Sequence, residues 1–151
     1  MHDRGELSIL GDKTVPIAQW LLEVMEQVEG ENVAALIMDR YKQAELGEAI
    51  DRAGIRTPIV WRGTGWRDGG EDCERFRRAA FNGKVRSRPS LLLRSAFADA
   101  VVLKDPANNL KLAKARSTGR IDAVQAAVIS VAEGARRIGR PATKARVAKW
   151  V

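Results

Sequence analysis

The sequence predicts an α/β domain in which helices flank a sheet and a β-hairpin precedes the last helix. Two apolar runs of strand length, Val33–Asp39 and Thr57–Trp61, enclose an amphipathic segment, Tyr41–Gly54. Continuous apolar runs are typical of strands buried on both faces, and strand–helix–strand order predicts a parallel pair. The 151 residues are enough to bury one core.

The first half of the chain predicts five elements. They are a strand over Glu6–Leu10, a helix over Val15–Val28, a strand over Val33–Asp39, a helix over Tyr41–Gly54 and a strand over Thr57–Trp61. The helices are indicated by apolar residues three and four positions apart, and the strands by short apolar runs. Gly30 is expected to end the first helix, because glycine readily adopts the left-handed conformation that follows many helices.

The second half begins with a glycine-rich segment, Gly63–Gly70, which matches neither common phosphate-binding pattern, so we expect a mobile surface loop. The elements expected after it are a helix over Glu71–Gly83, a short helical segment over Ser90–Ala100, a hairpin of Ala100–Pro106 and Leu110–Lys114, and a helix over Ile121–Arg137. The buried face predicted for the last helix consists of Ile121, Val124, Val128, Val131 and Ala135.

The chain is strongly basic, with a formal net charge of +7 and a pI of about 10.1. This charge favours a polyanionic partner, such as nucleic acid or an anionic membrane surface, over a merely soluble basic protein. Neither an apolar run of about 18 residues nor a signal-peptide pattern is present, so we expect a cytoplasmic protein with no membrane partner.

Cys73 and His2 are the only residues of their kinds and lie far apart, which argues against a zinc site or a Cys–His pair.

The C-terminal end carries much of the positive charge. Residues 134–151 contain six cations and no acid, which suits either a nucleic-acid-binding arm or a solvated end. We therefore divide the chain into a domain over residues 1–137 and a basic tail over residues 138–151.

Two acids stand at positions where a site is expected. Asp39 ends a buried strand, and ligands of α/β sheets bind at the carboxyl ends of strands. Asp122 begins the last helix, directly after a basic segment. Taken singly, Asp39 could close a turn and Asp122 could complement the helix dipole. Together, beside cations that suit phosphate contacts, they suggest a metal site for phosphodiester chemistry.

Several segments, taken in order, resemble the nuclease domain of the large terminase subunit of tailed phages. They are IMDRY (Ile37–Tyr41), VWRGTGW, FNGKV (Phe81–Val85), the apolar segment PSLLLRSAFADA running into the hairpin, and KARSTGRIDA. The resemblance covers about residues 5 to 137 and depends most on the last block and its distance from Asp39.

This resemblance implies a ribonuclease H-like mixed sheet with flanking helices and a β-hairpin, and metal-dependent cleavage of DNA by three acids. Asp39 would be the second acid and Asp122 the third, and both would bind Mg²⁺ or Mn²⁺. The residues expected to contact DNA are Lys104, Lys111, Lys114, Arg116 and Arg120.

The family's first strand, which carries the first acid, has no counterpart, so we expect a fold lacking its first strands and leave open whether the chain is an enzyme. Asp3, Glu6 and Asp12 are poor substitutes for that acid, and Asp99 is expected to be structural. The missing strand would leave an open edge on Val33–Met38. Either Glu6–Leu10 pairs with this edge or a second copy does, which would make a homodimer.

The resemblance also implies partners. Double-stranded DNA in the bacterial host is the expected substrate, and an upstream ATPase segment, the small terminase subunit and the portal are expected partners. The chain contains no GxxxxGK[ST] motif of its own. Two alternatives remain, a non-catalytic DNA-binding remnant and an interaction module of a packaging complex.

Overall fold

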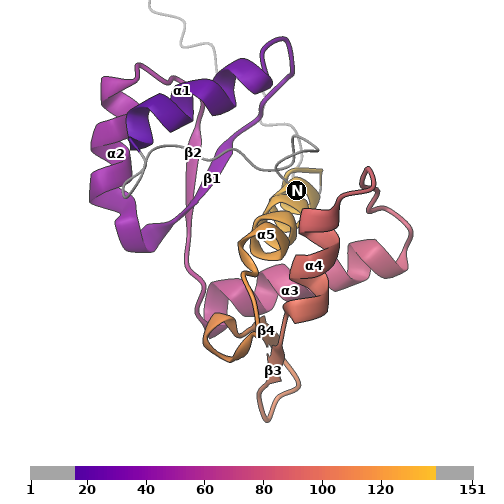
Figure 1. Ribbon diagram of the computed structural model, residues 1–151. Coiled ribbons are helices and arrows are strands. Elements are labelled where there is room, and N and C mark those ends of the chain that lie inside the picture. The colour runs from indigo at the N-terminus through magenta and orange to yellow at the C-terminus, as the bar shows by residue number, and fades with distance from the viewer. Residues whose placement is uncertain (1–15, 139–151) are drawn as a thin grey trace, which may run out of the picture.

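The structure, a computed structural model, describes residues 16–138, which form two groups of elements (Figure 1). The first group is α1 (Ile17–Gln27), β1 (Leu36–Asp39), the 3₁₀ turn η2 (Arg40–Lys42), α2 (Gln43–Arg52) and β2 (Ile59–Arg62). The second group is α3 (Trp66–Phe81), α4 (Leu91–Asp99), β3 (Val102–Lys104), β4 (Leu110–Leu112), the 3₁₀ turn η3 (Lys114–Arg116) and α5 (Asp122–Ile138).

The first group confirms the predicted strand–helix–strand unit. Strands β1 and β2 pair in parallel, with Leu36 opposite Ile59 and Asp39 opposite Arg62. Leu21 of α1 packs with Ala49 and Ile50 of α2 in a small core, on which apolar residues of both strands also pack. Because the pair is parallel, the carboxyl ends of both strands meet at one edge of the sheet.

The second group has a core of its own, between helices α3, α4 and α5. Its fully buried members are Ala96 of α4, Ile121 just before α5, and Val124 and Val128 of α5. Helix α3 packs against α5 and β4, and β4 pairs antiparallel with β3 in the predicted hairpin. The hairpin turn uses Asn108, which has a positive φ of 65°, a conformation that asparagine tolerates better than most residues.

The predicted α/β class is confirmed for the described residues, whereas the ribonuclease H-like mixed sheet stays a prediction. Their strands form two separate two-stranded sheets, because β4 packs on α3 and does not extend the parallel pair. The strand expected over Val33–Asp39 begins at Leu36, whose N–H donates to Pro58 O at 2.9 Å. The expected strand over Glu6–Leu10 lies outside the described residues.

The glycine-rich segment is not the expected mobile loop. Helix α3 already begins at Trp66, with Gly65 as its N-cap and Gly69 N donating to Gly65 O at 2.8 Å. A Cβ on Gly69 would lie 3.0 Å from Thr64 O, and Gly70 is buried against the backbone of β4. These glycines therefore allow other backbone segments to pack closely against the start of α3. Glycine is usually taken as a sign of a loop, so the sequence did not indicate this role.

The buried face of α5 was predicted correctly only in its first half. Ile121, Val124 and Val128 are buried as expected, but the next buried residues are Ala132 and Glu133. Val131 is only partly buried and Ala135 is exposed. The pattern of apolar residues did not reveal this, because a glutamate takes a buried position in the last turns.

Within residues 16–138, none of the helices is both long enough and apolar enough to span a bilayer.

Candidate functional site

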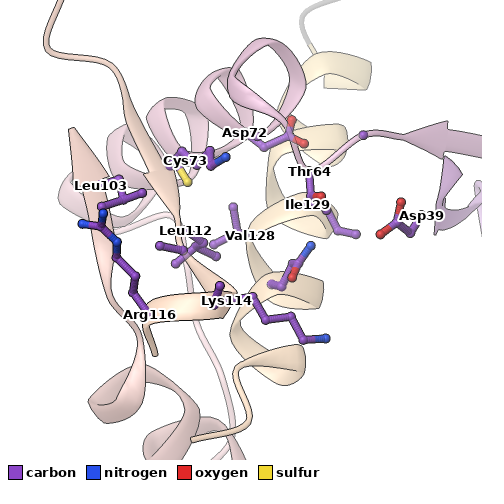
Figure 2. Close-up of a pocket in the computed structure, with 16 residues that line it drawn as sticks. Asp39, Thr64, Asp72, Cys73, Leu103, Leu112, Lys114, Arg116, Val128 and Ile129 are labelled. Carbon is purple, nitrogen blue, oxygen red and sulfur yellow. The ribbon is translucent and has the colours of Figure 1, made fainter. Parts of the chain in front are cut away.

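A cavity of about 340 Å³ lies where the carboxyl ends of β1 and β2 meet the second group of elements. We call it the strand-end pocket. Figure 2 shows Asp39 and Thr64 on one side of it and Lys114 and Arg116 from the η3 turn on another, with α3 and α5 behind. The pocket therefore lies at the edge where ligands of parallel sheets bind.

Asp39 reaches the pocket because it is the last residue of β1. Its Oδ1 accepts a hydrogen bond from Tyr41 N at 3.0 Å, which caps the η2 turn. The side chain is otherwise exposed to the pocket and to solvent. The structure thus combines both interpretations of Asp39, the turn-closing residue and the acid at the ligand edge.

Three of the five cations expected to contact DNA line the strand-end pocket. Lys111 comes from β4, and its ammonium lies 5.0 Å from the centre of the Trp66 ring, a cation–π contact. Lys114 and Arg116 come from η3. Lys104 and Arg120 are exposed but do not line the pocket.

Asp122 lies beside the strand-end pocket and does not line it. It is the first residue of α5, and its carboxylate is bound by the ammonium of Lys114. Gln125, almost one helical turn further along, does line the pocket. Lys114 therefore links Asp122 to the pocket that contains Asp39, and a shared site for the two carboxylates stays a prediction.

The metal expected from the sequence can be compared with these donors. Carboxylate oxygens are the ligands that Mg²⁺ and Mn²⁺ prefer. However, the described residues contain no group of three or more His, Cys, Asp or Glu side chains placed to hold a metal, and Asp122 is already paired with Lys114. The acids in the described part of the chain do not complete a two-metal site.

Asp99 has a structural role. Its Oδ1 accepts a hydrogen bond from Thr118 Oγ1 at 3.2 Å, and its Oδ2 accepts one from Ser95 Oγ at 3.4 Å. These bonds tie the segment before α5 to the end of α4, in keeping with the structural role expected of Asp99. Asp3, Glu6 and Asp12 lie outside the described residues.

The most buried acid of the described chain is Asp72 of α3, which the sequence analysis did not single out. Its side chain is 0% exposed and also lines the strand-end pocket. Arg62 at the end of β2 binds it with two bonds, Nη2 to Oδ1 at 2.8 Å and Nε to Oδ2 at 3.3 Å. Arg136 of α5 binds the same Oδ1. A charge buried this deeply is tolerated because two guanidinium groups compensate it.

The network continues along α5 and explains its buried glutamate. Glu133 accepts a bond from Arg136 Nη1 at 2.9 Å and another from Arg137 Nε at 3.0 Å. The ion pairs therefore connect β2, α3 and α5. The sequence does indicate that Asp72 is buried, because it lies four residues before Phe76 and therefore on the same inner face of α3. This spacing does not identify Arg62 and Arg136 as the partners of Asp72, because both come from other elements.

Cys73 follows Asp72 and is not suited to nucleophilic chemistry. It is a free cysteine, and burial raises the pKa of its thiol above the ordinary value. A raised pKa keeps the group protonated at neutral pH, and only the thiolate is a good nucleophile.

Asp68 fixes the turn between β2 and α3 at the rim of the strand-end pocket. Its Oδ2 accepts a hydrogen bond from Gly63 N at 2.9 Å. This bond, with the nearby charges of Arg62, Arg40 and Arg67, lowers the pKa of Asp68 below its ordinary value. The carboxylate also lies in the first turn of α3, where the helix dipole favours a negative charge.

We expect Asp68 to make stability depend on pH. Because its pKa is lower in the folded chain than in the unfolded chain, its stabilisation is complete above the unfolded pKa of about 3.9 and is lost as the pH falls through the folded value. Asp68→Asn should therefore lower the urea midpoint of unfolding at pH 7. It should also make that midpoint decrease less as the pH is lowered, as measured by circular dichroism. Asp51→Asn, an exposed acid on α2, is the control, and equal acid profiles for both variants would contradict the assignment.

The chain is similar in sequence and in structure to a phage terminase, while no family model matches it. The sequence is 31% identical over 109 residues to a protein described as "Terminase, large subunit" from Enterobacteria phage HK97, and this alignment covers 72% of the chain and 22% of that protein. The structure matches the "Crystal structure of the HK97 bacteriophage large terminase" with a TM-score of 0.79 and 28% identity, covering 87% of the chain and 27% of the other. The chain thus spans about a quarter of the length of these relatives.

Proposed function

Because the chain is related to the phage terminase large subunit, we propose that it is the nuclease portion of such a subunit. It would act on double-stranded DNA during genome packaging in the bacterial cytoplasm, on a ribonuclease H-like fold. An ATPase segment, the small terminase subunit and the portal are its proposed partners in that assembly.

The observation that carries this proposal is the composition of the strand-end pocket. One strand-end acid, Asp39, shares the pocket with Lys111, Lys114 and Arg116, which come from the hairpin and the turn after it. Such cations can hold a phosphate backbone without reading its sequence, while an acid at the strand end faces the same space. A nuclease substrate needs this combination of phosphate contacts and a nearby acid.

The acids of the described chain do not suffice for a two-metal reaction, because Asp39 and Asp122 are only two donors and Lys114 already binds one of them. We therefore propose that Mg²⁺ or Mn²⁺ binds only when another carboxylate completes the set of ligands and the ion pair between Lys114 and Asp122 is broken. Cleavage by the chain alone should be weak for this reason.

The ion pair between Lys114 and Asp122 also favours a second candidate, a DNA-binding module without cleavage. A lysine that neutralises the acid competes with a metal ion for the same oxygens. In this alternative Asp39 and Asp122 are structural, and only the cations of the strand-end pocket act on DNA.

A plasmid assay separates the two candidates. Weak nicking of supercoiled plasmid in Mn²⁺ that Asp39→Asn or Asp122→Asn removes, with DNA still retained at low salt, would support the nuclease. Retention of DNA without any nicking would support the binding module. Asp51→Asn is the matched control on α2. Strong nicking that survives both substitutions would contradict the proposed site, and a chain that fails to bind DNA at low salt would contradict both candidates.

A further inference from the structure

A second cavity, of about 480 Å³, lies between α3, α4 and the hairpin. We call it the apolar groove. It is lined from α3 by Phe76, Ala80 and Phe81, from α4 by Phe97, and from β3 by Val102. Cys73, Leu112 and Val128 line both this groove and the strand-end pocket, so they form the wall between the two.

The groove exposes large apolar side chains that the described residues leave uncovered. Phe81 is 83% exposed, and Phe97 and Val102 are also exposed. Phe97 stacks on Phe76 with ring centres 5.9 Å apart, so part of the aromatic surface is held rigidly. Exposed aromatic side chains grouped in a hollow are characteristic of protein-binding surfaces.

Positive charge surrounds this apolar surface. Arg77 alone among the described residues lining the groove is charged. Phe97 also lines a neighbouring hollow of about 390 Å³, together with Arg88 and Arg94. Residues 75–94, which link α3 to α4, contain seven cations and no acid. None of the ion pairs within residues 16–138 neutralises Arg88 or Arg94.

We propose that the apolar groove and the adjoining hollow bind a segment of a partner protein that presents large apolar side chains next to Asp or Glu. The apolar residues would cover Phe81 and Phe97, and the acids would reach Arg88 and Arg94. Complementary charge of this kind speeds association and excludes partners of the wrong sign.

A second copy of the chain, its C-terminal residues and DNA each fit these features less well. A second copy would bring another chain of net charge +7, and the chain's own residues 139–151 carry four cations and no acid. Both would meet the arginines with like charge. DNA would satisfy the arginines but leave the apolar groove uncovered, because its outer surface is phosphate and sugar.

Selection from a displayed library of random short peptides on the immobilised full chain tests the proposal. We expect the retained peptides to be acidic and to carry a large apolar residue beside an acid. The best peptide should lose affinity about tenfold or more on Phe81→Ser, and again on Arg94→Glu, as measured by fluorescence anisotropy. Because Phe81 is so exposed, its substitution should leave the thermal melting of the chain unchanged.

Matched controls lie on α2 and the turn before it. Tyr41→Ser removes an aromatic side chain that is 90% exposed, and Arg52→Glu reverses an exposed charge, so neither should change peptide affinity. Retained peptides that are neutral or basic, or affinity insensitive to Phe81→Ser and Arg94→Glu, would overturn the proposal. So would a homodimer that Phe81→Ser dissociates in sedimentation, or DNA binding that Arg94→Glu abolishes.

Discussion

Replacing Asp72 with alanine should lower the free energy of unfolding by about 3–5 kcal/mol, because it leaves two arginines without their buried partner. Arg62 and Arg136 both bind Asp72, and their side chains are only 15% and 11% exposed. Without the carboxylate, neither guanidinium regains enough water to compensate its charge. Arg136 would keep only its bonds to Glu133.

Urea unfolding followed by circular dichroism measures this effect. Glu74→Ala is the matched control, because Glu74 lies on the same helix and also pairs with two arginines, Arg77 and Arg78, but at the surface. Exposed pairs contribute little, so its midpoint should hardly move. If both variants unfold at the same urea concentration, the buried network does not stabilise the chain as proposed.

A further variant separates the cost of an unpaired charge from the loss of packing. Replacing Asp72, Arg62 and Arg136 together by leucine and two methionines removes every partner at once. Apolar replacement of a whole buried ion network is often neutral or stabilising, so this variant should recover much of the stability lost in Asp72→Ala. If the triple variant does not recover stability, the loss in Asp72→Ala comes from lost packing and not from unpaired charges.

The network also bears on function, because it positions the walls of the strand-end pocket. Arg62 ends the strand beside Asp39, and Asp72 lines the pocket while holding both Arg62 and Arg136. The ion pairs therefore connect the sheet that carries Asp39 to the helix that begins at Asp122. A mutation here should weaken DNA binding indirectly, in proportion to the loss of structure.

Removing the three pocket cations should produce the largest change in DNA binding. For duplex DNA, the logarithm of affinity falls with the logarithm of salt concentration by about 0.9 for each phosphate contact. The variant Lys111→Ala, Lys114→Ala, Arg116→Ala should therefore reduce that slope by about 2.7. Between about 50 and about 200 mM salt, the wild-type chain should lose about 40-fold more affinity than the variant.

Fluorescence anisotropy with a short duplex measures both slopes. A matched triple variant, Arg77→Ala, Arg88→Ala, Arg94→Ala, removes three cations from the apolar groove and its hollow, so it should leave the slope nearly unchanged. If the slope decreases equally in the two triple variants, DNA affinity depends on the net charge of the chain and not on the pocket cations. Scrambling the sequence of the duplex should have no effect, because phosphate contacts carry no sequence information.

The sequence by itself determined the local elements that short-range patterns encode. The parallel pair around Asp39 and the hairpin after α4 formed as predicted, because apolar runs and helical spacing dictate which faces become buried. The resemblance in the blocks around Asp39 and Asp122 also led to the relationship that both comparisons support. Three of the five expected DNA contacts proved to line one pocket with Asp39.

Only the tertiary structure decided how the charged residues were used. Asp72 and Glu133 are buried because arginines from other elements, or from the next turn, reach them, and no local pattern states which acids will find such partners. Gly69 and Gly70 belong to a helix because Thr64 and β4 pack closely against them, whereas glycine in sequence suggests a loop. Asp122 is paired with Lys114 because the fold brings the η3 turn close to the start of α5.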